Sequence, residues 1–223
     1  MQRIIQKMGE IISNPTAMKF FLIKFYIIGA VGFLIPYTRS VFIMLTPLAL
    51  LLSFGLLVVN QQNKWRKTQI YVLVIIYFAS LIIEIIGVET GVIFGSYIYG
   101  NGLGVKVLGA PLMIGLNWVL LVYCSADIIR PLKLNPVIKV MASSALMLTY
   151  DLVLEQVAPM MNMWSWADGK IPLLNYIAWF VLGVLFNGIY YKEAQKTSNP
   201  LSAPVFLIQF AFFFIIMIVS KVI

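Results

Sequence analysis

Long apolar runs separated by short polar connections dominate the chain. A run of roughly 17 to 25 apolar residues can cross the hydrocarbon core of a bilayer as a helix. The pattern therefore predicts an all-α, polytopic helical bundle in which residues 1–223 form a single integral membrane domain. Its seven predicted spans are residues 20–37, 41–59, 69–88, 109–126, 137–155, 173–191 and 203–220.

The segment before Pro15 is too polar after its first residues for a cleavable signal peptide, and its spaced apolar residues predict a short interfacial helix. Basic residues predict the sidedness. With the N-terminus in the cytoplasm, eleven Lys and Arg residues fall on the cytoplasmic side and four on the other, as the positive-inside rule expects. The net charge of +8 is explained by this topology and by membrane lipids as partners, without nucleic acid.

Five of the eight acidic residues lie in or at the ends of the apolar runs, where ionisable groups are expensive and usually functional. The chain contains no histidine, so proton chemistry there must use carboxylates. This absence excludes histidine-box di-iron enzymes, His-ligated haem and the usual zinc sites, and no metal or cofactor is predicted. The last span has no lysine for a retinal Schiff base, and the chain has no DDxxD motif for magnesium and diphosphate. The five residues are Glu84, Glu89, Asp127, Asp151 and Glu155.

Helical rise predicts the depth of these side chains. At about 1.5 Å per residue, Glu84 and Asp151 both lie roughly 21 to 23 Å from the cytoplasmic edge of a core about 30 Å thick. Asn117 and Trp179 come down from the outer side into the same layer, roughly 10 to 12 Å deep. The remaining polar residues of this region, Glu89, Glu155 and Asn175, lie nearer the outer rim.

Spacing predicts which carboxylates act together. Asp151 and Glu155 are four residues apart and share a helix face. Desolvation and like charge then favour one protonated group beside one acceptor, the pairing that an acid–base catalyst needs. Glu84 and Glu89 are five apart and share a site only if the helix ends or unwinds between them, as Gly87 permits. Asp127, near Arg130, is interpreted as a cap or a surface ion pair.

Three features have two interpretations. Buried carboxylates can form a functional site or only bond to their neighbours and fix helix register. The tryptophans and tyrosines of the two long outer connections can form an interfacial aromatic belt or a lid over a site. Glycines that recur every four residues from Gly87 can form a helix-packing face or a broken segment beside a cavity.

Several motifs resemble the membrane-integral carotenoid biosynthesis proteins, which include the gamma-carotene and bisanhydrobacterioruberin hydratases. Residues 84–99 resemble the signature E-x-x-G-x-x-T-G-x-x-F-G-x-Y-x-Y of that family. The resemblance continues over residues 80–180, with one departure: Glu155 is followed by Gln156 where the family pattern has proline, which bears on the local backbone and on substrate preference. The matching residues after the signature are Gly109 to Pro111, Asn117, Trp118, Asp151 to Glu155, Trp164, Trp166, Pro172 to Tyr176 and Trp179.

This resemblance implies an enzyme that adds water across the terminal trisubstituted double bond of an acyclic carotenoid. Its substrate would be of the lycopene or gamma-carotene type, its partners other carotenoid-pathway enzymes, and its location the bacterial inner membrane. Such chemistry needs a carboxylic acid in an apolar pocket, aromatic faces for a tertiary cation and a carboxylate for the water. The predicted substrate-binding residues are Asn117, Trp118, Asn175, Trp179, Trp164, Trp166 and Tyr97.

The carboxylates receive hypothetical roles. Asp151, the deeper of its pair, is the predicted proton donor, Glu155 or Glu84 is the base, and Glu89 belongs to the polar network. Two rival functions stay open. A lycopene-type cyclase begins with the same protonation but quenches the cation with an internal double bond. A carotenoid-binding or proton-coupled membrane protein would use the carboxylates without catalysis.

Overall fold

The computed structural model describes residues 12–193 and 198–221. The predicted interfacial helix falls mainly on residues 1–11 and so lies outside the described residues. Helices dominate the fold, and four short strands occur in the connections at one end. In chain order the elements are α2 (Pro15–Leu34), α3 (Arg39–Met44), α4 (Thr46–Val59), α5 (Lys67–Thr90), β1 (Tyr97–Tyr99), β2 (Lys106–Val107), β3 (Ala110–Pro111), α6 (Leu112–Ile129), α7 (Pro136–Val157), β4 (Trp164–Trp166), α8 (Leu173–Glu193) and α9 (Ser202–Val219).

Six of these helices are long and apolar enough to span a membrane, so the predicted polytopic helical bundle is confirmed. The second predicted span differs, because two helices, α3 and the 14-residue α4, replace one continuous helix. Pro47 explains the interruption: its ring clashes with the carbonyl of residue 43 in a continuous helix, but it is well accommodated in the first turn of α4. At Gln156, where the family pattern noted above has proline, the helix is not interrupted, and α7 continues to Val157.

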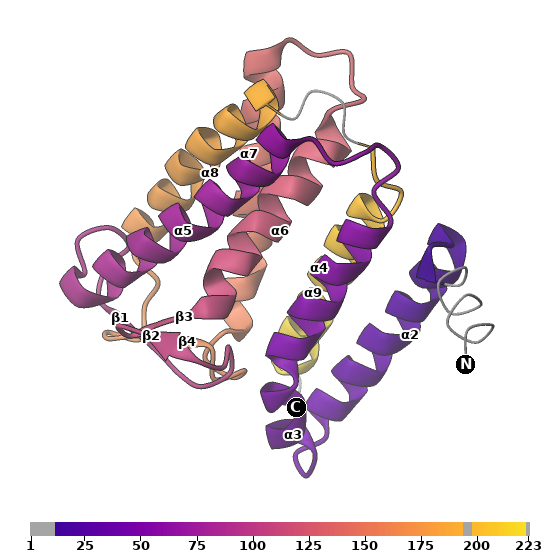
Figure 1. The fold of residues 1–223 in the computed structure, drawn as a ribbon. Coiled ribbons are helices and arrows are strands. Elements are labelled where there is room, and N and C mark those ends of the chain that lie inside the picture. The colour runs from indigo at the N-terminus through magenta and orange to yellow at the C-terminus, as the bar shows by residue number, and fades with distance from the viewer. Residues whose placement is uncertain (1–11, 194–197, 222–223) are drawn as a thin grey trace.

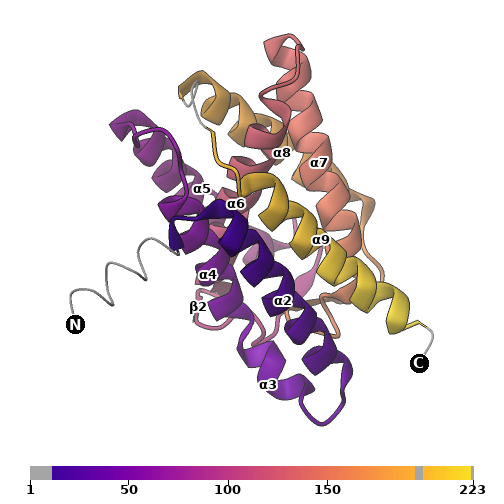
Figure 2. The same cartoon turned by 90° about the vertical axis from the view of Figure 1, so that its right-hand side faces the viewer.

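Helix α6 is the centre of the bundle. In its most apolar window 78% of the residues are buried, against 33 to 39% in the other candidate spans. This agrees with a helix that is apolar all round, whereas the outer helices expose one apolar side. Figures 1 and 2 show α4, α5, α7, α8 and α9 around α6, with α2 outside α4 and α9.

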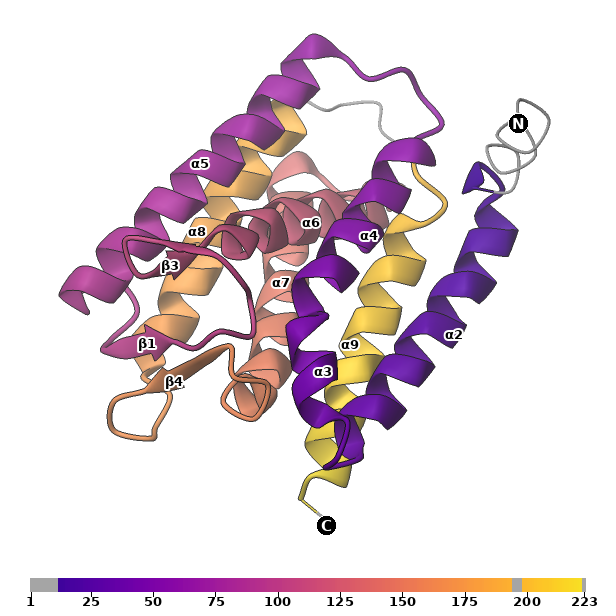
Figure 3. The ribbon, with the colours of Figure 1, turned by 60° about the horizontal axis from the view of Figure 1, so that its bottom comes forward.

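Two connections that are far apart in sequence meet below the helix ends. Strand β1, between α5 and α6, pairs antiparallel with β4, between α7 and α8. Figure 3 shows this pair across the ends of α5, α7 and α8. In the register, Tyr97 faces Trp166 and Tyr99 faces Trp164, and these four side chains are buried while the intervening Ile98 and Ser165 are exposed. We call the pair β1 and β4 the lid.

Candidate functional site

Glu84, in the last third of α5, is buried and accepts three hydrogen bonds. Its Oε2 accepts from the hydroxyls of Tyr97 and Tyr99, each at 2.7 Å. Its Oε1 accepts from the indole Nε1 of Trp118 on α6 at 3.0 Å. One carboxylate thereby connects a spanning helix, the central helix and the lid.

Glu155, near the end of α7, repeats this arrangement with the other strand of the lid. Its Oε2 accepts from the indole nitrogens of Trp164 at 3.1 Å and Trp166 at 2.8 Å. Its Oε1 accepts from Nδ2 of Asn175, in the first turn of α8, at 2.9 Å. All three partners can only donate at these nitrogens, so both oxygens of Glu155 act as acceptors.

Asp151 lies one helical turn before Glu155 and is fully buried. Its Oδ2 accepts from Nδ2 of Asn175 at 3.2 Å, so one amide group bridges the two carboxyl groups. Its Oδ1 is buried and has no hydrogen-bond partner among the described residues. Asp151 therefore differs from Glu84 and Glu155, since it alone of the three has a buried carboxyl oxygen without a hydrogen-bond partner among the described residues. We call Glu84, Asp151 and Glu155 the carboxylate cluster.

The lid supplies its donors by strand alternation. Successive side chains of a strand point to opposite faces, so Tyr97 and Tyr99 share one face, as do Trp164 and Trp166. Burial raises the pKa of the Tyr97 and Tyr99 hydroxyls, and the neighbouring Glu84 carboxylate raises it further. Both hydroxyls consequently keep their protons and donate to Glu84.

Gly87 explains how the lid comes so close to α5. A Cβ at Gly87 would lie 2.6 Å from the ring of Phe94 and 3.2 Å from the hydroxyl of Tyr97. One turn later, α5 ends at Gly91, whose left-handed conformation, with φ of 66°, favours glycine. Gly87 is thus a packing contact with the connection that follows α5 and not with another helix, and α5 ends before Gly91 instead of breaking within the span.

Aromatic rings and a small cavity complete the site. Trp118 stacks on Trp179 of α8 with ring centroids 4.2 Å apart and planes 20° apart. The cavity has a volume of about 10 Å³, close to the space that one water needs. Glu84, Glu155, Asn175, Trp179 and the four inward aromatic side chains of the lid contribute to its wall, and Asp151 lies behind Asn175, outside that wall.

The structure brings most of the predicted site residues together: the carboxylate cluster, Trp118, Asn175, Trp179, Tyr97, Trp164 and Trp166. It separates Glu89, which is exposed and lines a groove on the outer face of the lid. Glu84 and Glu89 were expected to share a site only if the helix ended or unwound between them, but α5 continues as a helix from Glu84 to Thr90. Asn117 is buried on α6, but its side chain makes no hydrogen bond to another described residue.

Two further residues change the sequence interpretation. Tyr99 was not among the predicted binding residues, although the alternation Tyr97-Ile98-Tyr99, matched by Trp164-Ser165-Trp166, would have identified it. Asp127 accepts the backbone N–H of Asn199 at 3.0 Å, just before α9, which makes it a cap for the α8–α9 connection. Within the described part of the chain, no group of three His, Cys, Asp or Glu side chains is arranged to hold a metal ion.

Comparison with protein families identifies the family of this chain. The model of a family described as carotenoid biosynthesis protein matches residues 39–223. The chain belongs to the carotenoid biosynthesis protein family. Its role is therefore in carotenoid biosynthesis, and the matched range contains the whole carboxylate cluster and both strands of the lid. A search of curated proteins and a search of solved structures gave no match.

Proposed function

We propose that this family member is a carotenoid hydratase, which adds water to the terminal trisubstituted double bond of an acyclic carotenoid end. The carrying observation is a buried carboxylate cluster in which Glu84 and Glu155 each accept three hydrogen bonds, whereas Asp151 has a buried oxygen without a hydrogen-bond partner among the described residues. A protonated carboxyl group in an apolar pocket is the acid that protonation of an unactivated alkene requires.

The reaction runs in two steps. The Asp151 carboxyl proton is transferred to the CH carbon of the double bond, whose π electrons form the new C–H bond and leave a tertiary cation. A water oxygen then bonds to the cationic carbon, and the proton it releases passes to Glu155. Return of that proton to Asp151, one helical turn away, restores the starting state, so the net change is the addition of one water.

The aromatic rings and the remaining carboxylate of the site are suited to these two reaction steps. The stacked indoles of Trp118 and Trp179 offer aromatic faces to the cation, and the Glu84 carboxylate offers it a negative charge. The water-sized cavity beside Glu155 favours capture by water. No step of this sequence calls for a redox cofactor or a metal.

The substrate needs more room than the closed site offers, since ligand pockets usually measure about 300 to 1,000 Å³. We infer that the lid and its helices separate to admit one end of the carotenoid. The polyene would lie in an apolar groove of about 450 Å³ between α4, α5 and α6. This groove adjoins the α5–α6 seam through Tyr77 and Leu116, and the bond from Trp118 to Glu84 closes the same seam.

We further infer that the N-terminus faces the cytoplasm, that the membrane is the bacterial inner membrane, and that other carotenoid-pathway enzymes deliver the substrate. The basic residues support this orientation. The connections α4–α5, α6–α7 and α8–α9, with the helix turns that adjoin them, hold Lys64, Arg66, Lys67, Arg130, Lys133, Lys139, Lys192 and Lys196, whereas the opposite end holds Arg39, Lys106, Lys170 and Lys221.

The test is chromatography with mass detection of pigments from cells that make lycopene or gamma-carotene, with and without the protein. Hydration predicts a more polar pigment that is heavier by one water. An isomeric product would instead identify a cyclase, and unchanged pigments with the protein verified in the membrane would leave either another carotenoid substrate or a carotenoid-binding protein. Asp151→Asn, inserted to the same level, should give no new pigment.

A further inference from the structure

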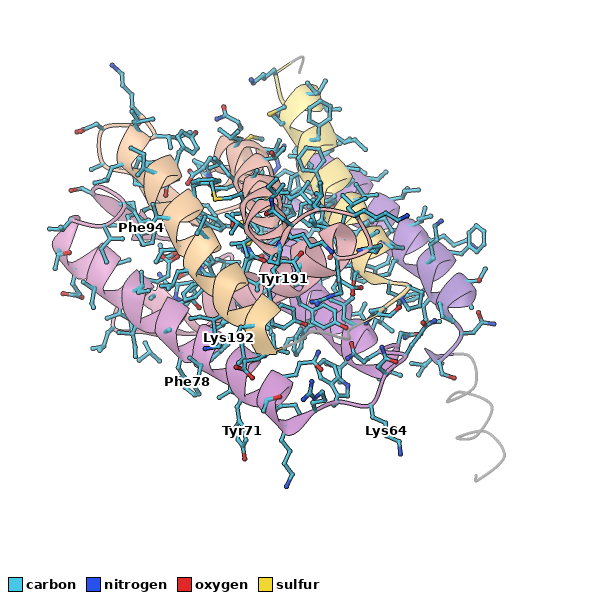
Figure 4. The ribbon with its side chains drawn as sticks, turned by 90° about the horizontal axis from the view of Figure 1, so that it is seen from above. Lys64, Tyr71, Phe78, Phe94, Tyr191 and Lys192 are labelled. Carbon is cyan, nitrogen blue, oxygen red and sulfur yellow. The ribbon has the colours of Figure 1, made fainter. Side chains whose placement is uncertain are left out.

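A second site lies at the opposite end of the molecule from the lid, where α6 ends, α7 begins and α8 ends. It is a cavity of about 490 Å³. Figure 4 looks onto this end and shows Tyr191 and Lys192 on the last turn of α8. Three cations of the wall come from separate parts of the fold: Arg130 from the end of α6, Lys139 from the first turn of α7, and Lys192 from α8.

Arg130 is held in place at this cavity by aromatic rings, and none of the acidic side chains among the described residues forms an ion pair with it. Its guanidinium carbon lies 5.0 Å from the ring centroid of Tyr191 and 5.9 Å from that of Tyr190, within the range of cation–π interaction. Its Nε and Nη2 are buried and have no hydrogen-bond partner among the described residues. A partly buried cation of this kind is costly unless an anion compensates its charge.

The neighbouring acidic groups do not supply that anion. Asp127 lies one turn before Arg130, but its Oδ2 is engaged by the backbone of Asn199. Glu193 follows Lys192 in sequence and is not part of the cavity wall. The amino end of α7 at Pro136 adds the positive end of a helix dipole to the same wall.

The rest of the wall is apolar. Leu134, Val137 and Val140 line it beside the three cations, and Leu134 and Val137 are exposed on the surface of the bundle. A free phosphate ion gains nothing from contact with apolar side chains, whereas the acyl chains of a lipid pack favourably against them. Cationic and apolar walls side by side match the two chemical parts of an anionic phospholipid.

We propose that this cavity binds the phosphate headgroup of an anionic phospholipid, with its acyl chains against Leu134, Val137 and Val140. Lys139 and Lys192 contact the phosphate oxygens, and Arg130 adds its charge from the bottom of the cavity. The site lies on the side predicted to face the cytoplasm, where the positive-inside rule also concentrates basic residues. It is independent of the proposed hydratase activity.

The test uses the full chain, purified in a non-ionic detergent and titrated with phosphatidylglycerol, with phosphatidylcholine or with inorganic phosphate. Native mass spectrometry should detect a one-to-one phosphatidylglycerol adduct, and this adduct should survive higher collision energies than the adducts of phosphatidylcholine or inorganic phosphate. Lys139→Gln with Lys192→Gln should weaken that adduct by about tenfold or more, since each Lys near an anionic lipid surface contributes roughly a factor of five. The matched control is Lys64→Gln with Lys67→Gln, which removes the same charge outside the cavity: Lys64 lies in the α4–α5 connection (Figure 4), and Lys67 is the first residue of α5.

Three outcomes would overturn the proposal. Equal weakening in the control pair would mean unspecific attraction to surface charge. Displacement of the lipid by inorganic phosphate at millimolar concentration would identify a site for a free phosphate group. Equal retention of phosphatidylcholine would show that the cationic wall does not select the lipid. Folding is checked by the unfolding temperature of each variant, and a variant pair that unfolds early is replaced by Lys192→Gln alone.

Discussion

Two buried polar networks each include a side chain of α7, and they differ in completeness. One is the carboxylate cluster. The other, which we call the neutral row, runs from Tyr150 through Gln209 and Tyr26 to Ser53, with hydrogen bonds of 3.2, 2.8 and 2.9 Å. Tyr150 and Asp151 are adjacent in sequence, yet each belongs to a different network.

The two networks differ in charge and in hydrogen-bond satisfaction, and this difference distinguishes a structural network from a candidate reactive site. The neutral row contains no charge, crosses α7, α9, α2 and α4, and leaves none of its side-chain oxygens or nitrogens buried without a partner. The carboxylate cluster concentrates three acidic groups and keeps one oxygen of Asp151 unpartnered, and two of its members, Glu84 and Glu155, line a small cavity. A satisfied neutral network fixes helix positions, whereas a buried acid with an unsatisfied oxygen, next to groups that line a cavity, is a candidate for chemistry.

The largest effect should come from comparing the two adjacent residues of α7. Asp151→Asn keeps the shape of the side chain but removes the acid, and we expect hydration to fall by about 10² to 10⁴. Tyr150→Phe removes only the hydrogen bond to Gln209, and it should lower stability by about 1 to 3 kcal/mol while hydration continues. Pigment analysis and thermal unfolding in detergent measure the two effects. Full hydration by Asp151→Asn would remove this residue from the donor role.

The second comparison lies within the carboxylate cluster. Both oxygens of Glu155 accept from obligate donors, so the amide NH₂ of Glu155→Gln must face a donor in either orientation. We expect a loss of about 1 to 3 kcal/mol of stability and of about 10² in hydration.

Glu84→Gln is the matched variant, because the Tyr97 and Tyr99 hydroxyls can reverse and accept from its amide. It should retain more stability than Glu155→Gln. If Glu84→Gln unfolded at a lower temperature than Glu155→Gln, this would contradict the view that Glu155 is surrounded only by obligate hydrogen-bond donors.

The third comparison concerns the two faces of the lid. Tyr97→Phe with Tyr99→Phe keeps the rings but removes both donors to Glu84, at a cost of about 1 to 3 kcal/mol. Hydrogen exchange should become faster in residues 97–99 and 164–166, and hydration should fall. Ser165→Ala, on the exposed face of β4, should change neither. If both variants behave alike, the tyrosine hydroxyls do not hold the lid closed.

The smallest effect should distinguish two apolar cavities. Val74 is half-exposed and lines the groove between α4, α5 and α6, while Ile28 lines a cavity of about 310 Å³ beside the neutral row. Val74→Trp should slow hydration several-fold by obstructing the polyene, and Ile28→Trp should leave it near the original rate. Turnover of the two variants is measured at equal expression in the membrane. If Ile28→Trp were slower than Val74→Trp, the polyene would be assigned to the cavity beside α2.

The sequence predicted what depends on local spacing. The helical period correctly grouped Asp151 with Glu155, and apolar length predicted the spanning helices. The sequence left a lid and an aromatic belt as alternatives, and it could not predict the pairing of β1 with β4, because these strands are separated by more than 60 residues and short strand pairs leave only a weak local pattern. Glu89 was grouped with Glu84 by proximity in sequence, whereas an unbroken helix turns it outward. Whether Asn117 contacts the substrate stays a prediction.

The chain carries five tryptophans, and only Trp65 lies away from the carboxylate cluster. Two of the others donate to Glu155, one donates to Glu84, and the fourth stacks on that third indole. The ultraviolet emission of the whole protein is therefore mainly a signal from the site itself. Opening of the lid, or arrival of a polyene able to quench indole emission, becomes observable in real time without an added dye.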